Sequence, residues 1–267
     1  MDNNLRVVLL DSDLEEVFFR LVEKDPLDYL FFVKGWMYDK ANTEVYLALG
    51  DDDIKGSMLI YKRGIIHLRG ESDAIHKLME KLDVDQVIEG LIYQEHLPIF
   101  SSKYSLDSIH MMNMMLLLKG EEKLHIVHNV LPLESEYAKE IADLMRNIKP
   151  DWWGYITPET ISNSIAKGAL WFGVKANGRI VSVTSGKILF KLGRYVLAHV
   201  GIVATHERYR RMGYATSTLS KLLEKLLVNA NIVSIYVLAD NYPAIKLYEK
   251  LGFKHYRSYL FVKAKRK

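Results

Sequence analysis

The segment that most restricts the fold is an arginine-rich turn between a predicted strand and a predicted helix. Residues 194–203 alternate like a buried strand, and residues 214–227 place their leucines on one face of a helix. The turn contains the spacing R-x-x-G-x-A, formed by Arg210, Gly213 and Ala215. Small residues let a phosphate approach the backbone, and the start of a helix offers unpaired N–H groups with partial positive charge. The turn predicts an anion site, although a purely structural turn can have the same composition.

A second segment, residues 238–253, favours a functional interpretation of the turn over a purely structural one. A predicted strand ends at Leu238, Asn241 is placed to cap a helix, Tyr248 lies two turns further on, and Gly252-Phe253 ends that helix. The two segments, in this order, resemble motifs A and B of the GNAT acetyltransferase superfamily, the second as N-x-x-A-x-x-x-Y-x-x-x-G-F. The resemblance covers roughly residues 125–267. It implies an α/β fold with a mixed sheet, the GNAT-like acyl-CoA acyltransferase fold.

The predicted elements suggest that this arrangement occurs twice. Residues 125–267 read as β-α-α-β-β-β-α-β-α-β, beginning with a strand at 125–131, and Asn177-Gly178 predicts a hairpin. Residues 1–124 follow a fainter version of the same order without either motif. This half resembles the degenerate first domain of tandem family members, such as the glycine N-acyltransferase-like proteins.

Charge divides the chain at the same place. Residues 1–124 carry 14 basic and 23 acidic side chains, a net charge of −9, whereas residues 125–267 carry 22 and 10, a net charge of +12. We therefore expect two domains: 1–124, acidic and degenerate GNAT-like, and 125–267, basic and acyl-CoA-binding. The opposite charges are also explained if the two halves attract each other.

Several protein classes are disfavoured by composition. The chain has no cysteine, which excludes disulfides and thiol catalysis, and its nine histidines lack metal-ligand spacing, so no metal is expected. There is no apolar run of about 20 residues, and Met1–Asn4 lacks a signal-peptide pattern, so we expect a cytoplasmic protein with no membrane partner. The basic tail and arginine cluster come without a nucleic-acid-binding motif, so no nucleic acid is expected. A homodimer is left open.

The resemblance implies an N-acyltransferase that moves an acetyl group from acetyl-CoA to a primary amine by direct attack on the thioester. The strand at 194–203 would diverge from its neighbour to admit the pantetheine arm, and fixed backbone dipoles would position the substrate. The residues implied in cofactor binding are Val203, Ala204, Thr205, Arg210, Arg211, Met212, Gly213, Tyr214, Ala215, Thr216, Asn241 and Tyr248.

Two side chains are candidates for proton transfer. Tyr248 matches the position of the general acid in many family members, and a phenol is protonated at neutral pH. His199 lies eleven residues before Arg210, where several members carry a base, and histidine titrates in a suitable range. The alternatives are a core tyrosine and a hydrogen-bonded histidine within a buried strand.

The acceptor amine is the least determined feature. In the superfamily the acceptor groove lies beside the first two helices of the domain, and Trp152, Trp153 and Tyr155 fall between them here. These aromatic residues would either line that groove or fill the core. The leading hypothesis is a small-molecule amine; the alternatives are a protein or peptide amine, and an acyl-CoA-sensing module without turnover.

Overall fold

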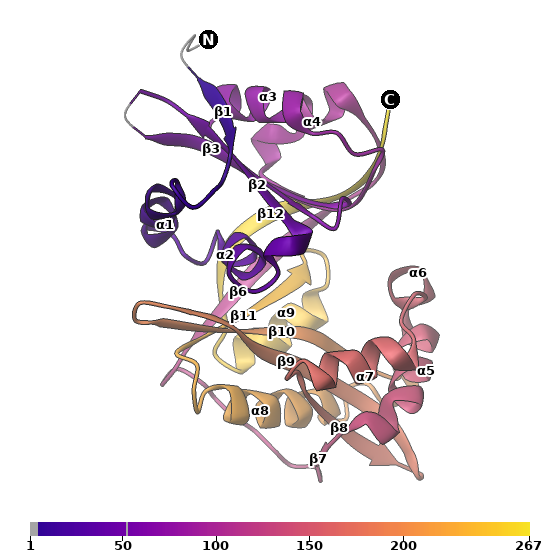
Figure 1. Ribbon diagram of the computed structural model, residues 1–267. Helices are drawn as coiled ribbons and strands as arrows, with labels where there is room; N and C mark the ends of the chain where they lie inside the picture. Colours follow the sequence, from indigo (N-terminus) through magenta and orange to yellow (C-terminus); the bar gives the residue numbers. More distant parts are fainter. Residues whose placement is uncertain (1–4, 52) are drawn as a thin grey trace. The chain divides into compact units, whose positions relative to one another are not determined.

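The computed structural model describes residues 5–51 and 53–267, which form two compact units (Figure 1). The first unit holds the described residues up to Asn113, together with Leu238–Asp240 and Ser258–Lys267; the second holds Met114–Val237 and Asn241–Arg257. The prediction about Met1–Asn4 lies outside the described residues. No helix in the described chain is long and apolar enough to cross a bilayer.

The first unit consists of a sheet and several helices, and the spacing of hydrophobic residues explains where its helices form. In the helix Ser72–Lys81, the residues Ala74, Ile75, Leu78 and Met79 recur at helical spacing and are buried. The elements are β1 (Arg6–Leu9), α1 (Glu15–Lys24), α2 (Leu30–Tyr38), β2 (Thr43–Leu49), β3 (Ile54–Tyr61), β4 (Ile65–Gly70), α3 (Ser72–Lys81), β5 (Gln86–Ile92), α4 (Leu97–Lys103) and the start of β6 (Tyr104–Leu118).

The second unit has the same kinds of element. Asn177 and Gly178 both adopt positive φ, at 50° and 76°, which confirms the predicted hairpin between the strands Leu170–Ala176 and Arg179–Leu192. The elements are the end of β6, β7 (Leu131–Pro132), α5 (Ala138–Ile148), α6 (Pro150–Trp153), α7 (Pro158–Ala166), β8 (Leu170–Ala176), β9 (Arg179–Leu192), β10 (Tyr195–Thr205), α8 (Tyr214–Leu226), β11 (Ile232–Leu238), α9 (Tyr242–Lys250) and the start of β12 (Lys254–Arg266).

Both units share one strand topology. In the first, the order β1-β2-β3-β4-β5 has antiparallel neighbours up to β4 and a parallel pair β4–β5. In the second, β7-β8-β9-β10-β11 repeats this pattern, with β10–β11 as the parallel pair. In each unit a helix connects the two parallel strands, α3 in the first and α8 in the second. This repeat agrees with the predicted duplication and with the mixed sheet.

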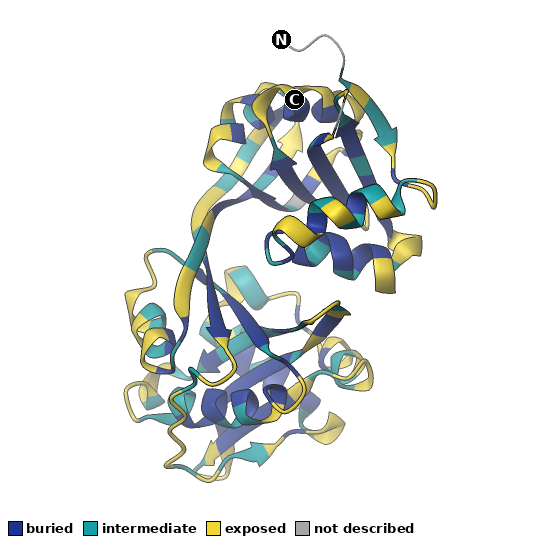
Figure 2. Cartoon of the chain, turned by 90° about the vertical axis from the view of Figure 1, so that its left-hand side faces the viewer, coloured by how far each residue is buried: buried dark blue, intermediate teal, exposed yellow. Residues whose placement is uncertain are grey.

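The second unit buries both faces of its sheet. On one face α5 and α7 pack on a core that includes Ile141, Trp171 and Val183. On the other face α8 and α9 pack on a core that includes Val200 and Leu222. Figure 2 shows the strands as largely buried and the loops as exposed. Two layers of helices around a sheet leave the strand ends and the turns as the places where backbone can meet a ligand.

The structure differs from the predicted elements at the first strand of the C-terminal half. The segment 125–130 is not a strand, and only Leu131–Pro132 pairs with β8. The prediction was wrong because the amides of this segment donate to serine hydroxyls of α8 instead of to a neighbouring strand. Strands β6 and β12 each continue from one unit into the other.

Candidate functional site

Strand β10 separates from β11 halfway along its length. The two strands pair in parallel from Leu197 with Ile232 to Val200 with Ile235. Strand β10 then runs on to Thr205 while it remains paired with β9. A β-bulge at Gly201 interrupts the β9–β10 register at the point of separation. A bulge bends a strand and ends pairing, so the edge of β10 beyond Val200 has no ladder partner in β11.

The bulge also changes which way the side chains of β10 point. Before it, Ala198 and Val200 lie in the core beneath α8 and α9; after it, Val203 packs against that core and Ala204 lies in the opposite one. Thr205 Oγ1 is 2.8 Å from Ser182 Oγ. Because these side chains are used in packing and in a local hydrogen bond, the main chain is the part of residues 203–205 suited to a ligand.

The turn after β10 presents the start of α8 without a cap. Gly213, at the N-cap, has φ 81° and ψ 0°, and no side chain caps this helix start in the described chain. The first intrahelical bond runs from Ser217 N to Gly213 O at 3.0 Å. The amides of Tyr214, Ala215 and Thr216 come before that bond, and these residues are partly exposed. Uncapped amides with the positive end of a helix dipole favour an anion.

Basic side chains surround these amides. Arg208, Arg210 and Arg211 are exposed, as is Met212. The Arg210 Nε donates to Thr205 O at 3.3 Å, which connects the turn to the end of β10. The structure therefore brings the predicted residues 203–205 and 210–216 together on one strand, turn and helix. Their combined charge and geometry fit a diphosphate.

The predicted residues of the second segment lie at the start and the middle of α9. Asn241 caps the helix, as predicted, because its Oδ1 accepts a hydrogen bond from Ala244 N at 3.4 Å. Tyr248 is 5% exposed and lies in the same core as Val200 and Leu222. Burial raises the pKa of the Tyr248 phenol well above its ordinary value of 10.0, so this hydroxyl keeps its proton at neutral pH.

His199 has a partner that the sequence did not indicate. Its Nδ1 lies 3.0 Å from Ser234 Oγ, and Ser234 donates to Ala198 O at 3.3 Å. If the serine hydrogen goes to that carbonyl, the serine oxygen accepts from Nδ1–H, and in this tautomer the imidazole lone pair is on Nε2. Ala198 and Val200 point into the α8 core, so alternation places His199 on the opposite face of the sheet from Tyr248. Ser234 is a buried residue that pairs directly with His199 in the β10–β11 ladder and belongs to neither motif, which is why sequence reasoning missed it.

The aromatic residues proposed for the acceptor are divided among different environments. Trp153 is partly buried and packs against the core beneath α5 and α7. Lys149 Nζ lies 5.3 Å from the ring centroid of Trp152, and Tyr155 is 75% exposed. No group of His, Asp or Glu side chains suited to a metal occurs within residues 5–51 and 53–267.

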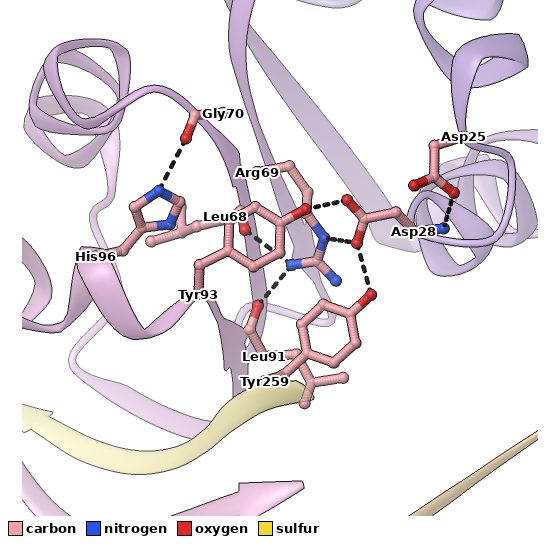
Figure 3. A network of polar contacts seen from close by, with 9 residues as sticks. All are labelled: Asp25, Asp28, Leu68, Arg69, Gly70, Leu91, Tyr93, His96 and Tyr259. Carbon is pink, nitrogen blue, oxygen red and sulfur yellow. Dashed lines mark hydrogen bonds and ion pairs between the residues drawn. The ribbon is translucent and has the colours of Figure 1, made fainter. Parts of the chain in front are cut away.

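In the first unit, side chains occupy the point where β4 and β5 diverge, which corresponds to the divergence of β10 from β11 in the second unit (Figure 3). The β4–β5 ladder ends at His67 with Leu91, yet no bulge interrupts the β3–β4 register between Gly56 and Tyr61. The guanidinium of Arg69 donates to Leu68 O at 2.8 Å and to Leu91 O at 2.9 Å, which joins the diverging strands. Its Nε donates to Asp28 at 2.6 Å, and both residues are at most 4% exposed.

Tyrosines complete this network around Asp28. Its carboxylate accepts hydrogen bonds from Tyr259 Oη at 2.6 Å and from Tyr93 Oη. The Arg69 guanidinium also lies over both rings, 4.5 Å from the Tyr259 centroid and 5.2 Å from that of Tyr93. Only Glu71 separates β4 from α3, and His96 Nε2 lies 2.9 Å from Gly70 O. Among its described residues, this unit therefore lacks the bulge, the long basic turn and the open strand edge of β10.

The strand divergence, the uncapped helix and the basic turn define a GNAT-type fold in the second unit, and comparison with known proteins agrees. Residues 138–253 match the family model "Acetyltransferase (GNAT) family". The C-terminal half of the chain therefore carries a GNAT acetyltransferase domain, as the two motifs predicted.

Relatives and solved structures extend this likeness. An N-alpha-acetyltransferase of Saccharolobus solfataricus is 47% identical over 58 residues, which are 21% of this chain and 35% of that protein. The chain thus spans about a third of the length of the curated relatives it matches. A GCN5-related N-acetyltransferase from Sphaerobacter thermophilus has a TM-score of 0.63 at 13% identity, covering 99% of this chain and 97% of that one. A tandem GNAT protein from the clavulanic acid biosynthesis pathway has a TM-score of 0.57 at 15% identity, covering 98% of each chain. At these identities the structural likeness concerns the fold.

Proposed function

We propose that the second unit is an N-acetyltransferase that transfers the acetyl group of acetyl-CoA to a primary amine. The observation that carries this proposal is the separation of β10 from β11 after Val200 beside an uncapped, arginine-rich helix start. The open edge of β10 is suited to the amides of a pantetheine arm. The amides of residues 213–216 are suited to a diphosphate, and Gly213 has no Cβ to obstruct it.

In the proposed reaction the amine nitrogen bonds to the thioester carbonyl carbon and the carbon–sulfur bond breaks. The attacking nitrogen loses one proton and the departing sulfur gains one. We assign the first proton to Nε2 of His199, which would accept it directly or through water while Ser234 contacts Nδ1. Tyr248 is the candidate donor of the second, since its raised pKa keeps it protonated. Asn241, at the N-terminus of α9, is assigned to cofactor binding.

The acceptor that we propose first is a small-molecule amine, with Trp152, Trp153 and Tyr155 as candidates for its binding. A peptide α-amine is the second candidate, because the curated relatives that match are named N-alpha-acetyltransferases. A panel of amino acids, polyamines and short peptides, scored by release of free thiol from acetyl-CoA, distinguishes the two.

Binding and turnover are tested separately. Acetyl-CoA is expected to raise the melting temperature of the wild-type protein, since a ligand stabilises the state that binds it. An unchanged melting temperature at saturating acetyl-CoA would refute the proposal. The Tyr248→Phe variant keeps the ring in the core and removes the proton donor; we expect it to bind acetyl-CoA and to lose about 100-fold or more in kcat. Binding without thiol release from any amine would favour a sensing module.

We also propose that the first unit is a degenerate GNAT-like domain that binds no acyl-CoA. Arg69 donates to the Leu91 carbonyl where β4 and β5 diverge. This is the counterpart of the point where β10 leaves β11, and Asp28 compensates the buried charge of the guanidinium. Isothermal titration of the full chain is expected to give one acetyl-CoA per chain, and Gly213→Glu should abolish all binding. A stoichiometry of two, or a site that survives this substitution, would contradict the proposal.

A further inference from the structure

The segment before β7 lies along α8 and is held there by hydrogen bonds. The His125 amide donates to Ser220 Oγ at 2.9 Å, and the Val127 amide donates to Ser217 Oγ at 3.1 Å. Both serines are fully buried and lie one helical turn apart, so the segment follows the helix axis toward its N-terminus. Residues 125–128 are therefore fixed in register with the first turns of α8.

This register places the side chain of His128 on the turn that starts the helix. Its Nε2 is 2.7 Å from Met212 O, and its ring centroid is 4.3 Å from that of Tyr214. A Cβ built on Gly213 would lie 3.3 Å from the same Nε2. A carbonyl oxygen only accepts, so the Nε2 of His128 is the donor.

The bond to Met212 O determines where the next amide points. In a trans peptide the C=O of one residue and the N–H of the next point in opposite directions. With the Met212 carbonyl held toward His128, the N–H of Gly213 is directed away from it. This turn has left-handed backbone on both sides of Met212, with φ 63° at Arg211 and 81° at Gly213; glycine adopts it readily, whereas at Arg211 it persists only where surrounding contacts hold it.

We propose that His128 is a positioning residue of the acyl-CoA site: by holding the Met212–Gly213 peptide it aims the Gly213 amide at the diphosphate. The inference rests on the proposed function and adds to it a residue that lies outside both motifs. His128 acts by holding the turn and takes no part in the proton transfers or in the attack on the thioester. Its loss should therefore weaken binding of acetyl-CoA and leave the chemical step unchanged.

The test compares three variants of the full chain. His128→Phe keeps an aromatic ring beside Tyr214 and removes the donor, whereas His128→Gln keeps an N–H donor. His125→Phe is the control, because His125 is exposed on the same segment and holds α8 through its backbone amide. Kd for acetyl-CoA is measured by titration, and KM and kcat by thiol release. Loss of one hydrogen bond predicts that His128→Phe raises Kd and KM about 2- to 10-fold with kcat unchanged.

His128→Gln is expected to recover most of this loss, and His125→Phe to match the wild type. The inference is overturned if His128→Phe binds as tightly as the wild type, if Gln restores nothing, or if kcat falls in place of affinity. Should His128→Phe not fold, the Kd of a His128→Leu variant relative to His128→Gln decides the same question. Failure of the wild type itself to bind acetyl-CoA would instead refute the proposed function, so the two failures are distinct.

Discussion

Replacing Gly213 by glutamate tests the anion site most directly. The residue has φ 81°, so any side chain there costs about 1–2 kcal/mol in backbone strain. Its Cβ would lie 3.3 Å from His128 Nε2 and 3.8 Å from Val127 Cγ2, a tight fit but not a clash with backbone. The substitution should therefore leave a folded protein with a modest loss of stability.

The effect on binding should be much larger than the effect on stability. A carboxylate about 4 Å from one phosphate charge costs about 4 kcal/mol at an effective dielectric constant of 20. Since every 1.4 kcal/mol changes an equilibrium about tenfold, acetyl-CoA affinity should fall by about 1,000-fold. Gly213→Ala carries the same strain without the charge and should show a smaller loss.

Gly168 provides the matched control. It also has φ 81°, and a Cβ there would meet nothing within 4 Å, so Gly168→Glu introduces the same strain and charge outside the site. We expect this variant to lose stability comparably and to keep its melting-temperature rise with acetyl-CoA. The measurement is thermal unfolding across an acetyl-CoA titration. Equal ligand-induced stabilisation of wild type and Gly213→Glu would refute the reasoning.

Three further predictions concern other parts of the chain. Asp28→Asn removes the carboxylate charge that faces the buried Arg69 guanidinium and should lower the free energy of unfolding by about 3–5 kcal/mol in urea titrations; a loss below 1 kcal/mol would contradict a buried ion pair. Burial, together with positive charge nearby, lowers the pKa of His67 well below 6.5, so below that pH the unfolded chain binds a proton that the folded chain does not. Stability should therefore fall as pH drops below 6.5, by up to about 1.4 kcal/mol per pH unit for this group, and a His67→Leu variant should show a shallower slope between pH 5 and 6.5. Ser234→Ala should lower kcat/KM about 2- to 10-fold with acetyl-CoA affinity unchanged, and have no effect in a His199→Ala background.

Much of the fold was predictable because its signals are local. The leucine face of α8, the Asn177-Gly178 turn and the Asn241 cap each depend on residues a few positions apart, and all three appear in the structure. The two motifs likewise predicted a GNAT acetyltransferase domain, because the glycine and the arginines of the first are adjacent in sequence. The predicted strand at 125–131 failed because its hydrogen-bond partners are serines about 90 residues away.

The residue patterns of this chain were enough to establish the strand–turn–helix that starts α8 and the family of the domain around it. Tertiary structure alone decided where β10 leaves β11, which hydroxyl orients His199, and that Tyr248 is buried. It also brought His128 to Met212 and joined Arg69 to Asp28. The physical reason is the same in each case: hydrogen bonding and burial depend on partners that the chain brings together only when it folds.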